Sequence, residues 1–138
     1  MIPEASKLAA LAIGAEEFAR RRRQLMQMAG EDAVVLVAAA PERMRNADAA
    51  WPYRQDSDFH YLAGFPEADA MLALLPGRRH GEAVLFCREH DPARERWHGA
   101  SIGTERAVAD FGLDDAFPIE DIDDILPGMI EGRGRVYC

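Results

Sequence analysis

The sequence predicts an α/β domain in which helices flank a single mixed sheet. Its 138 residues are enough for one hydrophobic core. Apolar runs of strand length alternate along the chain with segments of helical periodicity, as in α/β proteins. The run 33–40 is apolar throughout, which is typical of a strand covered by helices on both faces.

The first predicted element is a helix over residues 15–29. Glu16 and Glu17 suit the positive end of a helix dipole, and Gly30 ends the pattern. We expect residues 1–14 to form a flexible lead-in, so that the folded domain covers 15–138. The basic run 20–23 is expected to form a solvated helix face. The positions that fall on one stripe of this helix are Phe18, Arg22, Leu25, Met26 and Ala29.

The strands follow this helix. A strand over 33–40 ends at Pro41, and the loop 42–56 is long enough to indicate a working surface. Further strands are predicted over 57–62, 70–75 and 82–88, and the turn 76–81 joins the last two as a hairpin.

Two helices complete the predicted fold. The first covers 104–111, with Thr104 as N-cap and Gly112 as its end. The second covers 120–131, and Pro127 should kink or split it because proline removes a backbone donor. The residues from Arg135 onward look like the start of a strand, so we expect the sequence to be a fragment cut at a domain edge. The second helix is predicted from the spacing of Ile122, Ile125, Leu126, Met129 and Ile130.

Composition excludes several classes of partner. The net charge is −8, so nucleic acid and anionic membranes are not expected to bind the chain. No apolar run approaches the roughly 20 residues that span a bilayer. The two cysteines are too few for a disulfide scaffold, which favours a cytoplasmic protein.

The residues show no catalytic constellation. The four histidines form no HxH or HExxH pair, Cys87 lies in an apolar run, and Ser57 has no base nearby. A small enzyme that uses Asp56, Asp58 and His60 is an alternative. Strand alternation would put Asp58 and His60 on one face but would leave Asp56 in the loop.

The stretch from Arg45 to Leu75 carries a resemblance to a known family. It reads RNADAAWPYRQDSDFHYLAGFPEADAMLALL and resembles the N-terminal domain of Xaa-Pro aminopeptidase, also called aminopeptidase P. The resemblance covers about residues 15–138. The matched positions are Arg45, Asp48, Pro52, Tyr53, Arg54, Gln55, Asp56, Ser57, Asp58, Phe59, Tyr61, Leu62, Gly64 and Phe65.

The resemblance implies a ribonuclease H-like, creatinase N-terminal fold and an enzyme whose active site lies elsewhere. In this family a C-terminal pita-bread domain holds two manganese ions between two Asp, one His and two Glu, and removes the N-terminal residue that precedes proline. None of these ligands can be assigned to the chain, so we expect it to bind no metal and to be inactive alone.

The resemblance also implies partners and site residues. The partners are the C-terminal catalytic domain, neighbouring subunits of a homo-oligomer such as a tetramer, and proline-containing peptides. Trp97 and Asp48 are expected to wall a neighbouring subunit's substrate site, Trp97 with an apolar face and Asp48 toward the substrate ammonium. Arg45, Tyr53, Arg54 and Asp58 are expected to be structural, with Arg54 and Asp58 holding the loop before the strand.

A stand-alone protein-interaction module of the same fold is the alternative function. The acidic face from Asp110 to Asp124 could suit a basic partner. The sequence encoded after Cys138 distinguishes the two functions, since it either supplies metal ligands or stops.

Overall fold

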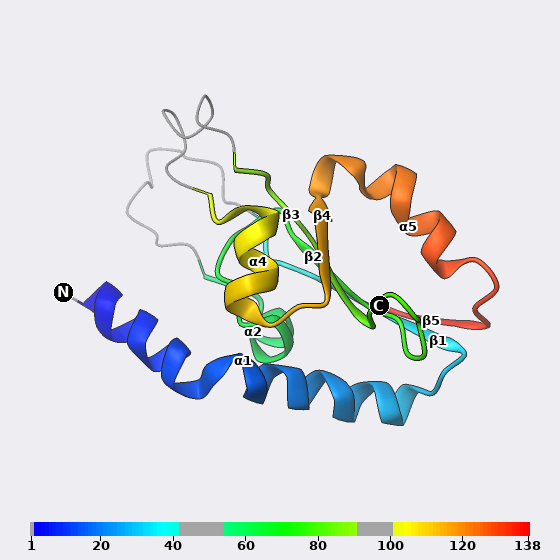
Figure 1. Ribbon diagram of the computed structural model, residues 1–138, viewed down its shortest axis with the longest axis horizontal. Helices are drawn as coiled ribbons and strands as arrows, with labels where there is room; N and C mark the ends of the chain where they lie inside the picture. Colours follow the sequence, from blue (N-terminus) through cyan, green and yellow to red (C-terminus); the bar gives the residue numbers. More distant parts are fainter. Residues whose placement is uncertain (1, 42–53, 91–100) are drawn as a thin grey trace.

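A five-stranded mixed sheet forms the centre of the computed structural model, which describes residues 2–41, 54–90 and 101–138 (Figure 1). The strand order is β4-β3-β2-β1-β5. The central strands β1, β2 and β3 pair antiparallel, and each outer strand pairs parallel with its neighbour. The strands are β1 (Ala33–Ala38), β2 (Met71–Leu74), β3 (Ala83–Cys87), β4 (Asp115–Pro118) and β5 (Arg135–Tyr137).

Helices cover both faces of this sheet. The helices α1, α2 and α4 lie on one face, and α5 lies on the other (Figure 1). This arrangement confirms the predicted α/β domain with one mixed sheet. The helical elements are α1 (Ile2–Ala29), α2 (Ser57–Ala63), α4 (Gly103–Phe111), the 3-10 turn η1 (Ile119–Asp121) and α5 (Ile122–Ile130).

Alternation along the central strands divides the core into two layers. In β2, Leu72 and Leu74 face α1, α2 and α4, whereas Ala73 faces α5. All five residues of β3 are buried, with Leu85 on the first face and Phe86 on the second. Strand β1 also carries buried side chains toward both layers. This explains why the run 33–40 is apolar throughout.

The segment predicted as a strand over 57–62 is helix α2, so that prediction is wrong. The apolar residues Phe59, Leu62 and Ala63 are spaced for one helix face, and all three are buried. Asp56 caps the first turn and Gly64 ends the helix in the left-handed region, at φ 66°. Both signals lie in the sequence, but six residues are too few for the helical period to stand out from strand alternation.

The other helices differ from prediction at their ends. Helix α4 begins at Gly103 with Ile102 as N-cap, and the Thr104 hydroxyl donates to Glu89 Oε1 at 2.8 Å instead of capping. Pro127 lies within α5 without dividing it, and the change of helix type occurs earlier, where η1 meets α5. Before Ala15, where only a lead-in was expected, α1 is helical as far back as Ile2 and has non-helical angles at Gly14.

Strand β4 was not predicted. It is four residues long, ends in proline and is only half-buried, so it lacks the apolar run that marks the other strands. It pairs with β3 from Val84 to Cys87.

Among the described helices, none combines the length and the apolar composition that a bilayer-spanning helix needs.

Candidate functional site

The described part of the motif stretch forms the start of α2 and the turn before it. The Asp56 side chain accepts a hydrogen bond from the Phe59 backbone N–H at 2.9 Å and caps the helix. Asp58 lies in the first turn, where its charge suits the helix dipole. Because this segment is a helix, Asp58 and His60 do not share one face, which removes the geometry of the small-enzyme alternative.

Gln55 connects three segments around this turn. Its Oε1 accepts hydrogen bonds from the backbone N–H groups of Ala40 and Asp56, both at 2.9 Å. Its Nε2 donates to the carbonyls of Phe65 at 3.2 Å and Glu67 at 3.0 Å. Gln55 therefore joins the end of β1 to both ends of α2. The sequence marked it as a motif residue, but only the fold shows this role.

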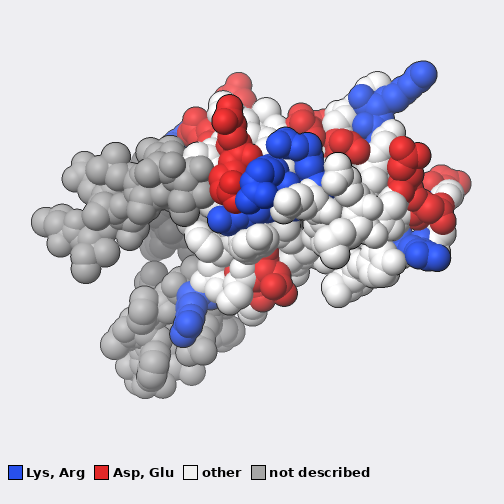
Figure 2. All heavy atoms as spheres, turned by 90° about the horizontal axis from the view of Figure 1, so that it is seen from below, with Lys and Arg blue, Asp and Glu red and all other residues white. Residues whose placement is uncertain are grey.

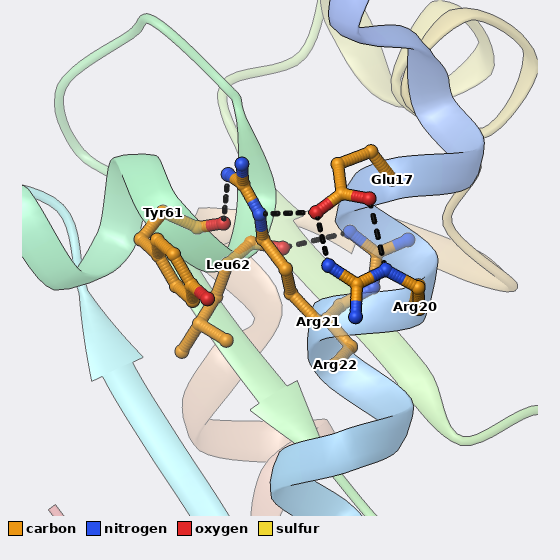
Figure 3. A network of polar contacts seen from close by, with 6 residues as sticks. All are labelled: Glu17, Arg20, Arg21, Arg22, Tyr61 and Leu62. Atoms are coloured by element: carbon orange, nitrogen blue, oxygen red, sulfur yellow. Dashed lines mark hydrogen bonds and ion pairs between the residues drawn. The ribbon is translucent and has the colours of Figure 1, made fainter.

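Arg21 joins α1 to α2 on the outer side of the same region (Figure 3). Its guanidinium lies 4.3 Å from the centre of the Tyr61 ring and donates to the Tyr61 carbonyl at 3.2 Å. It also bonds Glu17 at 3.0 Å, and Arg20 bonds the same carboxylate at 2.6 Å. Hydrogen bonds from Arg20 and then Arg21 lower the pKa of Glu17 to about 2, so this carboxylate is charged at neutral pH.

Arg22 lies beneath this surface and is 1% exposed, so the prediction of a solvated face over 20–23 is wrong at this position. Its Nη1 donates to the Leu62 carbonyl at 2.8 Å, and its Nη2 donates to the Gly112 carbonyl at 3.0 Å. These carbonyls lie at the C-terminal ends of α2 and α4, where helices leave acceptors unpaired. Burial lowers the pKa of Arg22 to about 10, which still leaves it charged at neutral pH.

A groove of about 590 Å³ opens between α1, α2 and the side of the sheet where β1 meets β5. Leu25 and Val37 contribute apolar lining, and Asp56 and Asp58 lie where α2 begins. Arg21 and Tyr61 stand at its edge, already engaged with each other. Arg21 therefore serves the packing of α1 on α2, and Asp56 caps α2, so both of these charged groups have structural partners.

Charge on this side of the molecule is mixed. Seen from below, basic and acidic side chains lie beside one another and do not gather into one area of a single sign (Figure 2). Arg20 and Glu17 of α1 form an ion pair of opposite charges. A surface of this kind does not attract polyanions over a distance.

The sequence-predicted site residues fall in two groups. Trp97, Asp48, Arg45 and Tyr53 lie outside the described residues. Arg54 and Asp58 are described and exposed, and neither forms a side-chain hydrogen bond or ion pair with another described residue. Asp56 and Gln55 hold the described turn before α2. The role expected of Arg54 and Asp58 in holding the loop stays a prediction.

The described residues do not fit the metal that the family resemblance implies. No group of three or more His, Cys, Asp or Glu within 2–41, 54–90 and 101–138 is placed to hold an ion. Cys87 is fully buried in β3, and burial raises the pKa of its thiol to about 12. It is therefore a small core residue and not a nucleophile, as the sequence predicted.

Comparison with protein families gives one match over most of the chain. Residues 18–137 match the family described as "Aminopeptidase P, N-terminal domain". The chain is 38% identical over 126 residues to Xaa-Pro aminopeptidase of Escherichia coli, which covers 91% of this chain and 29% of the relative. It is 37% identical to human Xaa-Pro aminopeptidase 3, over 88% of this chain and 26% of the relative.

Solved structures agree with these matches. The aminopeptidase PepP of Pseudomonas aeruginosa superimposes with a TM-score of 0.84 and 58% identity, over 89% of this chain and 28% of that one. A zinc-substituted aminopeptidase P of E. coli in complex with product gives a TM-score of 0.82 and 37% identity, over 90% and 28%. The chain therefore spans less than a third of the length of these proteins.

The Arg22 contacts generate a stability prediction. Arg22→Met keeps the apolar stem but leaves two helix-end carbonyls without their donors, so the free energy of unfolding should fall by about 2–4 kcal/mol. In Arg22→Lys the free energy of unfolding should fall by less, because the lysine ammonium can reach one of the two carbonyls but does not have the guanidinium fork. Urea unfolding followed by circular dichroism measures both.

The matched control is Arg20→Met, which removes an exposed arginine from the same helix. It should change stability little, since exposed ion pairs contribute little. An Arg22→Met variant as stable as Arg20→Met would contradict the role assigned to Arg22.

Proposed function

Because the chain belongs to the aminopeptidase P N-terminal domain family, we propose that it is the non-catalytic N-terminal domain of a Xaa-Pro aminopeptidase. Such an enzyme releases the N-terminal residue that precedes proline. The observation that carries the proposal is the match of residues 18–137 to this family, together with relatives of which the chain spans 29% or less. The catalytic groups belong to the rest of the polypeptide.

The geometry of the groove supports a structural role for this domain. Arg21 is held by Glu17 and Tyr61, Arg22 by two carbonyls, and Asp56 by a backbone N–H. Groups fixed in this way hold helices in place. The domain then acts by shape, through oligomer assembly and enclosure of the substrate.

The metal belongs, on this proposal, to the C-terminal domain, as a pair of manganese ions. The zinc-substituted structure of E. coli aminopeptidase P supports a metal site in enzymes of this kind. Since the described residues of this chain offer no matching group of ligands, no catalytic step is assigned to them. We place the enzyme in the cytoplasm, which the cysteine content supports.

A peptidase assay tests the proposed function. A polypeptide that continues past Cys138 with its natural sequence should cleave an Arg-Pro-Pro peptide when manganese is added, and the 138-residue chain should not. Release of the N-terminal residue is followed by chromatography, with an Arg-Ala-Pro peptide as the control for specificity. Cleavage by the 138-residue chain alone, or none by the longer polypeptide, would contradict the proposal.

We further propose that Trp97 and Asp48 wall the substrate site of a neighbouring subunit. Tryptophan offers a large rigid apolar face at low entropic cost, and a carboxylate can pair with the α-ammonium of a peptide. With this role, removing the domain from the oligomer should weaken substrate binding, although the metal site lies elsewhere.

In the longer polypeptide, Trp97→Ala should therefore lower kcat/KM roughly tenfold, equal to about 1.4 kcal/mol of transition-state stabilisation. Trp97→Phe, which keeps an aromatic face, should recover most of the loss. Size-exclusion chromatography with light scattering controls for the oligomer. Unchanged kcat/KM in Trp97→Ala with the oligomer intact would overturn this role.

A further inference from the structure

Strand β1 is paired along only half of one side. Strand β5 runs parallel to it and pairs Arg135 with Ala33 and Tyr137 with Val35. On its other side β1 pairs with β2 as far as Ala38. Within the described residues, no strand lies opposite Leu36–Ala38 on the β5 side.

The register fixes where the backbone N–H and C=O groups of this half-paired stretch point. Ala39 donates its N–H to the Ala70 carbonyl at 2.9 Å, so odd-numbered residues of β1 direct their backbone groups toward β2. Ala38 therefore directs its N–H and C=O groups, and Leu36 its C=O group, to the opposite side past the end of β5, while the Leu36 N–H faces the Tyr137 carbonyl. Open backbone groups at a sheet edge are a template for another strand.

The groove between α1 and α2 lies above the same stretch of β1. Val35 and Val37 line it, and so does Cys138. Two further lining residues are exposed apolar side chains, Met28 at 84% and Tyr137 at 45% exposure. Exposed apolar surface next to open backbone groups indicates a surface that another polypeptide segment covers.

We propose that this groove is the docking site of the residues that directly follow Cys138 in the longer polypeptide, which extend β5 beside Leu36–Ala38. The inference rests on the proposed function, since it takes the polypeptide to continue as its relatives do. In the register of β5, Cys138 lies opposite Leu36, and the next residue lies opposite Val37. That residue accepts a hydrogen bond from Ala38 N–H and donates one to the Leu36 carbonyl.

The register also sets the chemistry of the docked segment. Tyr137 pairs with Val35 and lines the groove, so the first and third residues after Cys138 direct their side chains into it. Their neighbours there are apolar side chains such as Leu25 and Val37, which favours apolar residues at both positions. The second residue faces the α5 side, as Val136 does.

Connectivity favours this segment over a second copy of the chain. The segment begins where β5 ends, so it is delivered to the open side of β1 with almost no loop to close. A second copy would have to lose its translational and rotational freedom to reach the same backbone groups. Each residue of a strand advances about 3.3 Å, so three residues suffice to cover Leu36–Ala38.

Amide hydrogen exchange in the longer polypeptide tests the docking. The Ala38 amide should exchange about 100-fold more slowly than in the 138-residue chain, because only there does it have an acceptor. The Val37 amide, which faces β2 in both, is the internal reference. Should the shorter chain not fold, Ala38 in the longer polypeptide must still exchange as slowly as Val37.

Proline placed at the first residue after Cys138 removes the donor to Leu36 and disfavours pairing with β1, so the segment should detach. Exchange at Ala38 should then become faster while Val37 stays protected. Rapid exchange at Ala38 in the longer polypeptide overturns the proposal, and so does protection that survives this proline. Protection that rises with protein concentration overturns it in favour of a second copy. Peptidase activity of the same sample separates this result from the proposed function, because an active polypeptide with an unprotected Ala38 refutes the docking alone.

Discussion

The buried guanidinium of Arg22 is the interaction on which the helical layer depends. One side chain from α1 donates to the last carbonyls of both α2 and α4, and each of those helices ends in a glycine with a left-handed conformation. At Gly64 the missing side chain also lets Phe18 approach, since a Cβ there would lie 2.7 Å from its ring. A cation between two negative helix ends is held without a carboxylate in contact.

This arrangement positions the surface that we assign to binding. With α1 fixed to α2, Arg21 stacks on Tyr61, and Gln55 bonds the backbone of Ala40 just after β1. The groove then lies between rigid elements, beside a strand that still has unpaired backbone groups. Within the described residues, the groove and the open backbone of β1 thus lie together on the side of the sheet that carries β5.

Much of the fold could be predicted because its signals are local. The apolar runs of β1, β2 and β3, the stripe of α5 and Gly112 all lie where the sequence predicts them. The predictions that failed concern residues whose contacts lie far away in the sequence. Arg22 falls on the apolar stripe of its helix and also within a basic run that was expected to be solvated, and only the fold brings its partners Leu62 and Gly112, 40 and 90 residues away, to it. Strand β4 has no apolar run, and only its pairing with β3 defines it. The motif from Arg45 to Phe65 predicted the family, but Gln55 acquires its role only from the tertiary contacts.

If the chain is the N-terminal domain of a Xaa-Pro aminopeptidase, the catalytic metal is held outside residues 1–138. Anomalous diffraction at the manganese absorption edge, from crystals of the longer polypeptide grown with manganese, tests it most directly. Every strong manganese peak should then be bound by residues that follow Cys138. A well-occupied manganese ion bound by two or more side chains from within residues 1–138 would contradict it.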